Sequence, residues 1–367
     1  MALKIIIAPM EHYQGIALFS GGLDSILSAR LLMEQGLSIK CLHFHSPFFG
    51  SPRRVDHWRK AYGLDIDSVD VSQEYVEMLC QGPVHGFGSA MNPCVDCKIL
   101  MMRRAKSLMQ DYGASFIASG EVLGQRPMSQ RRDTLHIILR DAEVRGILVR
   151  PLCAQHLDAT QAEISGLIDR TRLLGFNGRG RKDQLSLARA YGIEEIPTPG
   201  GGCKLTEKEN TRRFWPVLRR LSHPTANDFR LADIGRQFWH NSCWLSIGRH
   251  QQDNESYASV LDKDDVLLKV IGFPGPLAVA KGGKRWSGQD MRLAASLAAS
   301  YSPKACRAAQ DGSTIAVSAS AEGHSEKLAV IPSRESPFKE PAWEDARNDL
   351  HALRKACNAA SPVNNLE

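Results

Sequence analysis

Residues 16–32 read IALFSGGLDSILSARLL, and this stretch decides the fold. An apolar run ends at Phe19, a short loop of serines, glycines and an aspartate follows, and apolar residues then resume at helical spacing. The two glycines allow a tight turn and close backbone approach, and Asp24 and Ser25 are typical of a helix start. The stretch therefore predicts a strand, a loop and a helix whose N-terminus attracts an anion.

Strand-like and helix-like patterns alternate through the first two hundred residues. This alternation is typical of an α/β domain built on a mainly parallel sheet. The expected strands are 15–19, 37–45, 64–71, 114–120 and 146–152. The expected helices are 24–35, 53–62, 97–113 and 181–192.

The pattern changes after about residue 222 to shorter strands, at 243–248, 265–273 and 275–283, followed by a helix at 288–302. We expect a first domain over residues 1–220 and a smaller α+β domain over residues 225–317. Ser, Glu, Pro and Asn become frequent later, which predicts a poorly ordered tail over residues 318–367. One amphipathic helix is expected within that tail, at residues 341–360.

Composition narrows the class of protein. The chain has 367 residues, 43% of them hydrophobic and 23% charged, which predicts a sizeable buried core. A net charge of +6 fits a polyanionic partner but does not select one. The N-terminus lacks the long apolar region of a secretory signal, and no segment has the roughly 18 apolar residues that a membrane-spanning helix needs. We therefore expect a cytoplasmic protein without a membrane partner.

Nine cysteines in such a chain are expected to be reduced thiols rather than disulfides. Cys94 and Cys97 stand at the start of a predicted helix, where the helix dipole lowers a thiol pKa, and Lys98 adds to that field. Cys203 follows three glycines in PTPGGGCKL. The residues favour neither a redox pair nor a structural zinc site. They leave open a sulfur carrier with a resolving thiol and an iron–sulfur cluster with one open iron.

The loop SGGLDS, which is not a Walker A motif, resembles the SGGxDS signature of the PP-loop ATP pyrophosphatase superfamily. The resemblance implies an adenine nucleotide alpha hydrolase-like (PP-loop, HUP) fold, with ATP and Mg²⁺ as ligands. It also implies transfer of the α-phosphate to a carbonyl oxygen as an adenylate. By this likeness Asp24 helps to hold Mg²⁺, and the phosphates contact Ser20, Gly21, Gly22 and Ser25. The adenine is expected beside the end of the next strand, at His43, Phe44 and His45.

Four further motifs, NPCVDCKILMMRRA, SGEVLGQRPMSQRRD, GRGRKDQLSLARAYGI and PGGGCKLT, together resemble the tRNA thiouridine synthase branch of that superfamily. The resemblance covers nearly all of residues 1–215. It implies that uridine is adenylated and that sulfur then displaces AMP, giving 4-thiouridine or 2-thiouridine. By this likeness Cys97 and Cys203 handle sulfur, supplied by a cysteine desulfurase persulfide or by inorganic sulfide. Cys94 joins them if a [4Fe–4S] cluster is present, as in the cluster-dependent members.

Polar residues follow the strand expected at 114–120. Because parallel strands of an α/β sheet present ligands at their carboxyl ends, Gly120 and Gln125 are expected at the ATP site. Basic residues near this edge are expected to contact the phosphates of tRNA. These basic residues are Arg126, Arg131, Arg132, Arg179, Arg181 and Lys182.

The second domain resembles the RNA-binding domain found at the end of NFACT proteins. Arg249, Asn254 and Lys281 fall where that domain's polar residues gather, so Arg249 and Lys281 are expected to bind RNA. Trp239 and Trp244 lie in strand-like runs, which favours core packing over stacking on bases. No THUMP-like module precedes the loop, so the target uridine stays open, and so does the oligomeric state.

The sequence therefore predicts an ATP-dependent tRNA sulfurtransferase. One alternative is a PP-loop ligase or amidating enzyme with another substrate, which needs no set of cysteines. Another is a non-catalytic RNA-binding protein that only senses ATP.

Overall fold

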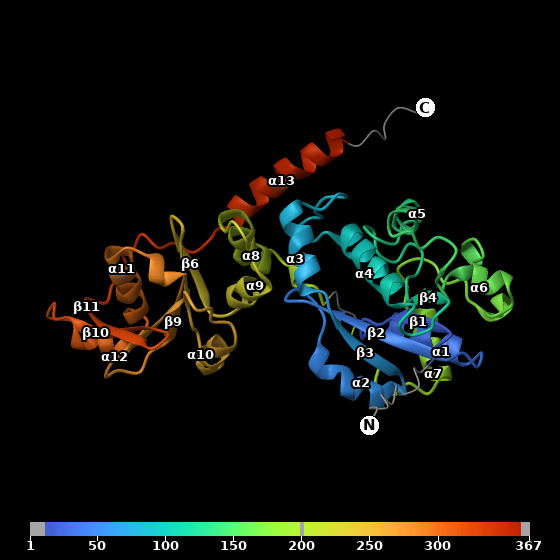
Figure 1. Cartoon of the computed structure of the whole chain (residues 1–367), viewed down its shortest axis with the longest axis horizontal. Coiled ribbons are helices and arrows are strands. Elements are labelled where there is room, and N and C mark those ends of the chain that lie inside the picture. The colour runs from blue at the N-terminus through green and yellow to red at the C-terminus, as the bar shows by residue number, and fades with distance from the viewer. Residues whose placement is uncertain (1–11, 199–201, 361–367) are drawn as a thin grey trace, which may run out of the picture. The chain divides into compact units, whose positions relative to one another are not determined.

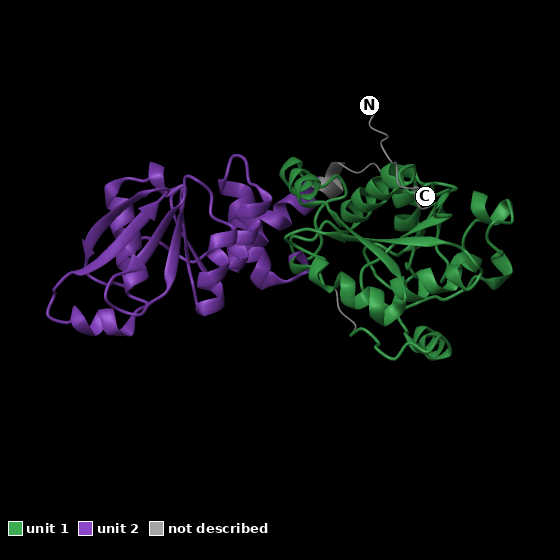
Figure 2. Ribbon diagram, turned by 60° about the horizontal axis from the view of Figure 1, so that its bottom comes forward, with its two compact units in different colours: residues 1–204 green, residues 205–367 purple. Residues whose placement is uncertain are grey.

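The computed structural model describes residues 12–198 and 202–360. It divides into two compact units, Met1–Lys204 and Leu205–Glu367 (Figures 1 and 2). The second unit begins earlier than the boundary near residue 220 expected from sequence. The reason is packing, because helix α8 (Lys208–Arg220) lies against α9 (Ala226–Asp233) and α13 (Trp343–Ala360) of the second unit.

The first unit is an α/β domain, as its sequence pattern predicts. Its strands are β1 (Gly15–Leu18), β2 (Ile39–His45), β3 (Asp65–Asp70), β4 (Phe116–Ser119) and β5 (Leu148–Val149). Its helices are α1 (Leu23–Met33), α2 (Val55–Tyr62), α3 (Ser72–Gln81), α4 (Cys94–Leu108), α5 (Arg132–Asp141), α6 (Gln161–Ile164) and α7 (Lys182–Ala190).

The five strands pair in the order β3-β2-β1-β4-β5, and every pair is parallel. The chain builds outward from β1 to β2 and β3, and then crosses to the other side of β1 for β4 and β5. Strand β1 is therefore the point where the strand order reverses. In open α/β sheets, ligands bind at the carboxyl ends of the strands at such a point, and the SGGLDS loop follows β1 there.

Alternate residues of β1 point to opposite faces of the sheet, and each face has its own apolar layer. Ala17 packs in a buried cluster with residues of α1, α2 and α7. Ile16 and Leu18 pack in a second buried cluster with residues of α4 and α5. Both faces of β1 are thus buried, which explains its uninterrupted apolar sequence.

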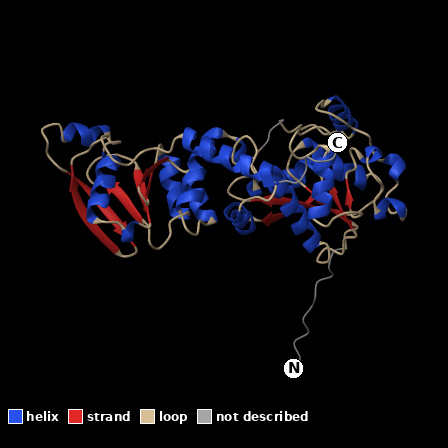
Figure 3. Ribbon diagram, turned by 90° about the horizontal axis from the view of Figure 1, so that it is seen from above, coloured by secondary structure: helices blue, strands red, loops and turns tan. Residues whose placement is uncertain are grey.

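The second unit contains an antiparallel sheet with helices packed against it (Figure 3). Its strands pair in the order β11-β10-β8-β9-β7-β6. They are β6 (Arg236–His240), β7 (Cys243–Ile247), β8 (Val266–Val270), β9 (Leu277–Lys281), β10 (Ile315–Ala321) and β11 (His324–Val330). Besides α8, α9 and α13, its helices are α10 (Gln251–Ser256), α11 (Gly288–Ala299) and α12 (Pro303–Ala308).

The expected poorly ordered tail from residue 318 is wrong over residues 318–330. Strand β10 crosses that position and pairs with β8 and with β11. Val317 and Ala319 are buried in the core of the second unit, although the polar residues between them gave the segment a tail-like composition. The expected helix at 341–360 is confirmed as α13, and residues 361–367 of the expected tail lie outside the described residues. In the part of the chain that the structure describes, no helix is both long and apolar enough to span a bilayer.

A buried ion pair joins the carboxyl ends of β4 and β5. Arg150 Nε lies 2.9 Å from Glu121 Oε2, and each side chain is 2% exposed. Burial alone would raise the pKa of Glu121, but the charges of Arg150 and Lys98 hold it below its ordinary value. The carboxylate is therefore kept ionised inside the protein by its partners.

Replacing Arg150 with glutamine should lower the free energy of unfolding of this unit by about 3–5 kcal/mol, because Glu121 would keep a buried charge without its main partner. Urea unfolding followed by circular dichroism measures this loss. Arg140→Gln is the matched control, since Arg140 pairs with Asp141 at the surface, and it should change stability little. Equal stability of the two variants would contradict the role given to the buried pair.

Candidate active site at the carboxyl edge of the parallel sheet

The SGGLDS loop is held together by its own serines. Ser25 Oγ donates a hydrogen bond to the Gly22 carbonyl oxygen at 2.7 Å and accepts one from the Ser20 N–H at 3.3 Å. The Gly22 N–H donates to Ser20 Oγ at 3.3 Å. Helix α1 begins at the next residue, Leu23. The predicted arrangement of strand, loop and helix N-terminus is confirmed.

Gly21 has a φ of +76°, and a Cβ there would lie 2.5 Å from Trp58 Cζ2. Both the backbone conformation and the space therefore require glycine. The buried Trp58 ring, from α2, also packs against His43 with ring centroids 4.9 Å apart. The sequence did not indicate this role of Trp58. Its place on an amphipathic helix indicated that the ring packs in the core, but not that it packs against Gly21 of the SGGLDS loop.

Asp24, in the first turn of α1, lies among polar side chains from the loop after β4 and from the start of α7. Burial raises the pKa of its carboxyl. The side chains of Gln125 and Gln184 and the positive charges of Arg181 and Arg126 partly offset this rise. Among the described residues, Asp24 Oδ1 is a buried oxygen without a hydrogen-bond partner. A buried carboxylate oxygen without a hydrogen-bond partner is suited to bind a hard cation such as Mg²⁺.

Gly120 follows β4 and touches the start of α1. A Cβ on Gly120 would lie 2.4 Å from the Asp24 carbonyl oxygen and 2.7 Å from the Ser25 backbone nitrogen. The loops after β1 and β4 are thus in backbone contact, as the strand order requires. Gly120 and Gln125 both lie beside the SGGLDS loop, where the sequence placed them.

The three residues expected beside the adenine, His43, Phe44 and His45, are the last three residues of strand β2. The buried His43 ring is used internally, with Nδ1 3.0 Å from the Phe19 carbonyl oxygen and Nε2 accepting the Ser51 N–H at 2.8 Å. Burial lowers the pKa of His43, which fits a neutral ring. Phe44 is buried and His45 is partly exposed. His43 therefore connects the residue after β1 to the loop after β2 through hydrogen bonds. Adenine contacts at His43, Phe44 and His45 stay a prediction.

The three expected thiols converge on Tyr75 of α3. Cys97, Cys203 and Cys94 all act on the Tyr75 hydroxyl and, with its burial, raise its pKa well above the ordinary value. Tyr75 is completely buried. The sequence did not indicate it, because the nearest of these cysteines along the chain, Cys94, is 19 positions away.

Neighbouring backbone and side chains position these thiols. The Asn92 amide donates a hydrogen bond to Cys94 Sγ at 3.1 Å. The Lys204 N–H donates to the Phe48 carbonyl oxygen at 2.8 Å, which ties the residue after Cys203 to the loop that follows β2. Three glycines precede Cys203, and the first two of them lie outside the described residues.

The expected low thiol pKa is wrong for Cys97. Cys94 and Cys97 do occupy the first turn of α4. Cys97 is partly exposed as a residue, but its thiol lies deep enough for desolvation to raise its pKa to about 12. Neighbouring Cys203 adds to this rise, and the Tyr75 hydroxyl and Lys98 only partly oppose it. Burial thus outweighs the helix dipole.

Lys98 links the thiols to the edge of the sheet. Its Nζ lies 3.7 Å from Glu121 Oε1, an oxygen that has no hydrogen-bond partner among the described residues. Glu121 directly follows Gly120, which touches the SGGLDS loop. The thiols and the candidate phosphate site are therefore joined through two side chains of the same unit.

The described residues contain no group of three or more His, Cys, Asp or Glu side chains arranged to hold a metal ion. The three thiols lie near one another, but their arrangement here does not fit cluster ligation.

The expected RNA-binding residues of the first unit fall into two groups. Arg126 and Arg181 lie close enough to Asp24 for their charges to act on it. Arg126 is nevertheless exposed and Arg181 is partly exposed. The other four, called the exposed group below, are exposed as well and do not act on Asp24, and Arg131 forms an ion pair with Asp133 at 3.2 Å. This exposed group consists of Arg131, Arg132, Arg179 and Lys182.

The expected RNA-binding residues of the second unit are paired with carboxylates. Arg249 Nε lies 3.2 Å from Asp253 Oδ2. Lys281 Nζ lies 2.8 Å from Asp228 Oδ1 and 3.6 Å from Asp265 Oδ2, and it also pairs with Asp262. RNA contacts at both positions stay a prediction, and an RNA phosphate at Lys281 would have to compete with three aspartates.

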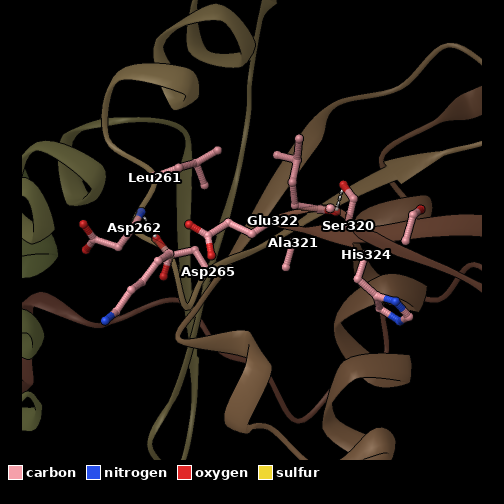
Figure 4. A pocket seen from close by; sticks show the side chains of 11 residues that line it. Leu261, Asp262, Asp265, Ser320, Ala321, Glu322 and His324 are labelled. Atoms are coloured by element: carbon pink, nitrogen blue, oxygen red, sulfur yellow. Dashed lines mark hydrogen bonds between the residues drawn. The ribbon is translucent and has the colours of Figure 1, made fainter.

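A pocket of about 490 Å³ lies next to this cluster (Figure 4). Three carboxylates, of Asp262, Asp265 and Glu322, line it together with one lysine, Lys263, and this excess of negative charge disfavours a phosphate. Trp239 and Trp244 are buried and stacked with ring centroids 5.1 Å apart, which confirms the expected core packing. Asn254 also has a structural role, since its Oδ1 accepts the Leu277 N–H at 3.0 Å.

Comparison with known protein families gives two matches. Residues 11–161 match the family described as thiamine biosynthesis protein (ThiI), and residues 235–340 match the NFACT protein RNA binding domain. The curated relatives include a probable tRNA sulfurtransferase of Thermococcus kodakarensis, 29% identical over 142 residues, which are 37% of this chain and 36% of that protein. A probable tRNA sulfurtransferase of Thermoanaerobacter sp. is 28% identical over 144 residues, 37% of this chain and 35% of that protein. The chain thus spans about a third of the length of these relatives.

Two solved structures show weaker similarity. The C-terminal part of the fibronectin/fibrinogen-binding protein from Streptococcus suis covers 42% of this chain and 74% of its own, at 15% identity and a TM-score of 0.25. A predicted subunit of tRNA methyltransferase from Methanocaldococcus jannaschii covers 38% of this chain and 69% of its own, at 17% identity and a TM-score of 0.29. TM-scores this low do not establish a shared fold.

The parallel sheet, the SGGLDS loop at its reversal point and the family match define the first unit as a PP-loop nucleotide-binding domain. Residues 11–161 of this unit are similar to the ThiI family, and residues 235–340 of the second unit are similar to the NFACT protein RNA binding domain.

Replacing Gly120 with alanine should weaken MgATP binding by at least about tenfold, because the new Cβ would force the backbone at Asp24 and Ser25 to move. Isothermal titration calorimetry measures the affinity. Gly288→Ala is the matched control, since a Cβ there meets no atom closer than 3.8 Å. Unchanged affinity in Gly120→Ala protein would contradict a phosphate site at this contact.

Alkylation of Cys97 by iodoacetamide should be slow at pH 7 and should still rise through pH 10, because a thiol with a pKa of about 12 is almost entirely protonated below that pH. Peptide mass spectrometry of protein labelled at several pH values measures the rate at this residue, with Cys97→Ser protein as the blank. A rate that levels off near pH 7 would mean that the helix dipole prevails over burial.

Proposed function

We propose that this chain is an ATP-dependent tRNA sulfurtransferase. It adenylates a uridine carbonyl oxygen, releases pyrophosphate and then replaces that oxygen with sulfur to give 4-thiouridine or 2-thiouridine. The observation that carries the proposal is the meeting, in one unit, of a PP-loop and three cysteines. Support also comes from the ThiI-type match and from relatives named as probable tRNA sulfurtransferases.

In the first step the uridine oxygen attacks the α-phosphorus of ATP, and the bond to pyrophosphate breaks. The SGGLDS loop and the N-terminus of α1 offer backbone N–H groups to the phosphates. Asp24 would hold Mg²⁺, which would neutralise charge on the departing pyrophosphate. Activation comes first because a uracil oxygen is a poor leaving group, whereas AMP is a good one.

In the second step sulfur attacks the activated carbon, a C–S bond forms and the C–O bond to AMP breaks. We assign the sulfur to a persulfide on one of the pair Cys97 and Cys203, loaded by transfer of the outer sulfur of a cysteine desulfurase persulfide. Inorganic sulfide would give the same persulfide by attacking a disulfide between Cys97 and Cys203, which breaks the S–S bond and releases the second cysteine as a thiol. The other thiol then attacks the S–S bond, which releases thiouridine and leaves a disulfide that an external thiol must reduce. Lys98, beside Cys97, offers a positive charge to the thiolate that this chemistry needs.

The named relatives match only 37% of this chain, so tRNA as substrate is part of the proposal. The NFACT-type domain of the second unit provides a second reason to expect RNA. We assign the holding of tRNA to this second unit.

The full chain, incubated with tRNA, MgATP and a persulfide donor, should form thiouridine and release pyrophosphate in step with it. Cys97→Ala and Cys203→Ala should each lower thiouridine formation at least about a thousandfold, because one thiol carries the persulfide sulfur and the other must attack the S–S bond to release thiouridine. Both variants should still release pyrophosphate when tRNA is present. Cys80→Ala, which removes an exposed cysteine of α3, is the matched control.

Mass spectrometry of digested tRNA measures the product and identifies the thiolated carbonyl. Pyrophosphate release by the wild-type protein that is not accompanied by any thiouridine would favour a PP-loop ligase acting on another substrate. No tRNA-dependent release at all would favour a non-catalytic ATP-sensing protein.

Iron and acid-labile sulfide content of protein purified without oxygen tests the alternative sulfur carrier. Iron-free protein that thiolates tRNA supports the persulfide pair. About four irons per chain, lost in Cys94→Ala protein, would replace it with a [4Fe–4S] cluster on Cys94, Cys97 and Cys203.

A further inference from the structure

Two loops far apart in sequence lie side by side at the SGGLDS loop. Leu123 and Asn177 form a parallel β-bridge, and the Gly178 N–H donates to the Leu123 carbonyl oxygen at 2.8 Å. A Cβ on Gly124 would lie 3.2 Å from Asn177 Oδ1, so the loops are in close contact. One loop continues to Arg126, and the other continues to Arg181, directly before α7.

Both arginines face the same carboxylate. The loop that leads to Arg126 starts at Gly120, which is packed on the backbone of Asp24. The charges of Arg181 and Arg126 both act on the Asp24 carboxyl. Neither arginine forms an ion pair within 4 Å of a carboxylate among the described residues. Two arginines therefore lie near Asp24 on adjoining loops, and their side chains, exposed for Arg126 and partly exposed for Arg181, are accessible to a ligand.

The candidate phosphate site lacks a cation of its own. The SGGLDS loop contains backbone N–H groups and hydroxyls but no lysine or arginine, and its one charged residue, Asp24, is negative. A bound polyphosphate carries several negative charges, and the pyrophosphate that leaves gains more. Arginine matches phosphate oxygens with two parallel N–H donors, which suits this task better than a single point charge.

We propose that Arg126 and Arg181 bind the polyphosphate of ATP, in place of the tRNA contact that the sequence suggests for them. The assignment deepens the proposed function and rests on it. It separates the basic residues of the first unit by task, because the exposed group of Arg131, Arg132, Arg179 and Lys182 stays available for RNA.

Calorimetric titration of the full chain with MgATP tests the arginine pair. Arg126→Ala and Arg181→Ala should each weaken MgATP binding by about tenfold or more, and the double variant by about a hundredfold. Arg126→Lys and Arg181→Lys should recover part of this loss, because charge returns without the bidentate geometry. Arg104→Ala and Arg189→Ala are matched controls, since both are exposed arginines on helices of the same unit, and they should stay within about twofold.

Binding of tRNA without nucleotide, measured by filter retention, gives the second readout. The proposal expects the two alanine variants to retain wild-type tRNA affinity and thermal unfolding. Unchanged MgATP affinity together with lost tRNA affinity would overturn it in favour of RNA contacts. Weakened MgATP binding in the control variants to the same degree would also overturn it, because the effect would then come from general charge. If the wild-type protein binds no MgATP, the proposed function itself is overturned. The wild-type titration alone shows this, so it is distinguished from a failure of the arginine assignment, which only the variants reveal.

Discussion

The backbone contact between the loops after β1 and β4 is the constraint on which the rest of the first unit depends. Gly120 lies against the backbone of Asp24 and Ser25 so closely that no side chain fits between them. This contact exists because β1 and β4 are neighbours at the point where the strand order reverses. It brings the SGGLDS loop, the buried Glu121 and the loop that carries Arg126 to one place.

Two kinds of charge meet around this contact, and burial decides how each behaves. Glu121 stays ionised because Arg150 and Lys98 offset its desolvation, whereas the pKa of Asp24 is raised because its offsetting partners are weaker than its desolvation. Lys98 extends the same network to Cys97. A thiol with a raised pKa is protected from adventitious oxidation and alkylation, because the thiolate is the reactive form.

The second unit has a different electrostatic character. Lys281 is surrounded by three aspartates, and the neighbouring pocket is lined by acidic side chains. A positive net charge for the chain therefore does not make every part of it a surface for phosphates. Polar residues that gather in a family motif, such as Arg249 and Asn254, hold their own domain together through Asp253 and the Leu277 backbone.

Local patterns along the chain determined the elements of the first unit and the place of its loop. Apolar runs set the strands, three- and four-residue spacing set most helices, and the glycines of SGGLDS required a tight turn. The sequence also indicated that Gly120 and Gln125 belong at the same sheet edge, because parallel strands end together. The sequence did not predict the strands β10 and β11. Only pairing with β8 shows that the polar residues of β10 alternate with buried ones, and β11 is a mostly exposed edge strand held by β10. Only the tertiary structure decided which residues meet: Tyr75 with the thiols, Gln184 and Arg181 with Asp24, Trp58 with Gly21. It also decided the pKa of Cys97, because desolvation depends on what surrounds a group in space and not on its neighbours in the chain.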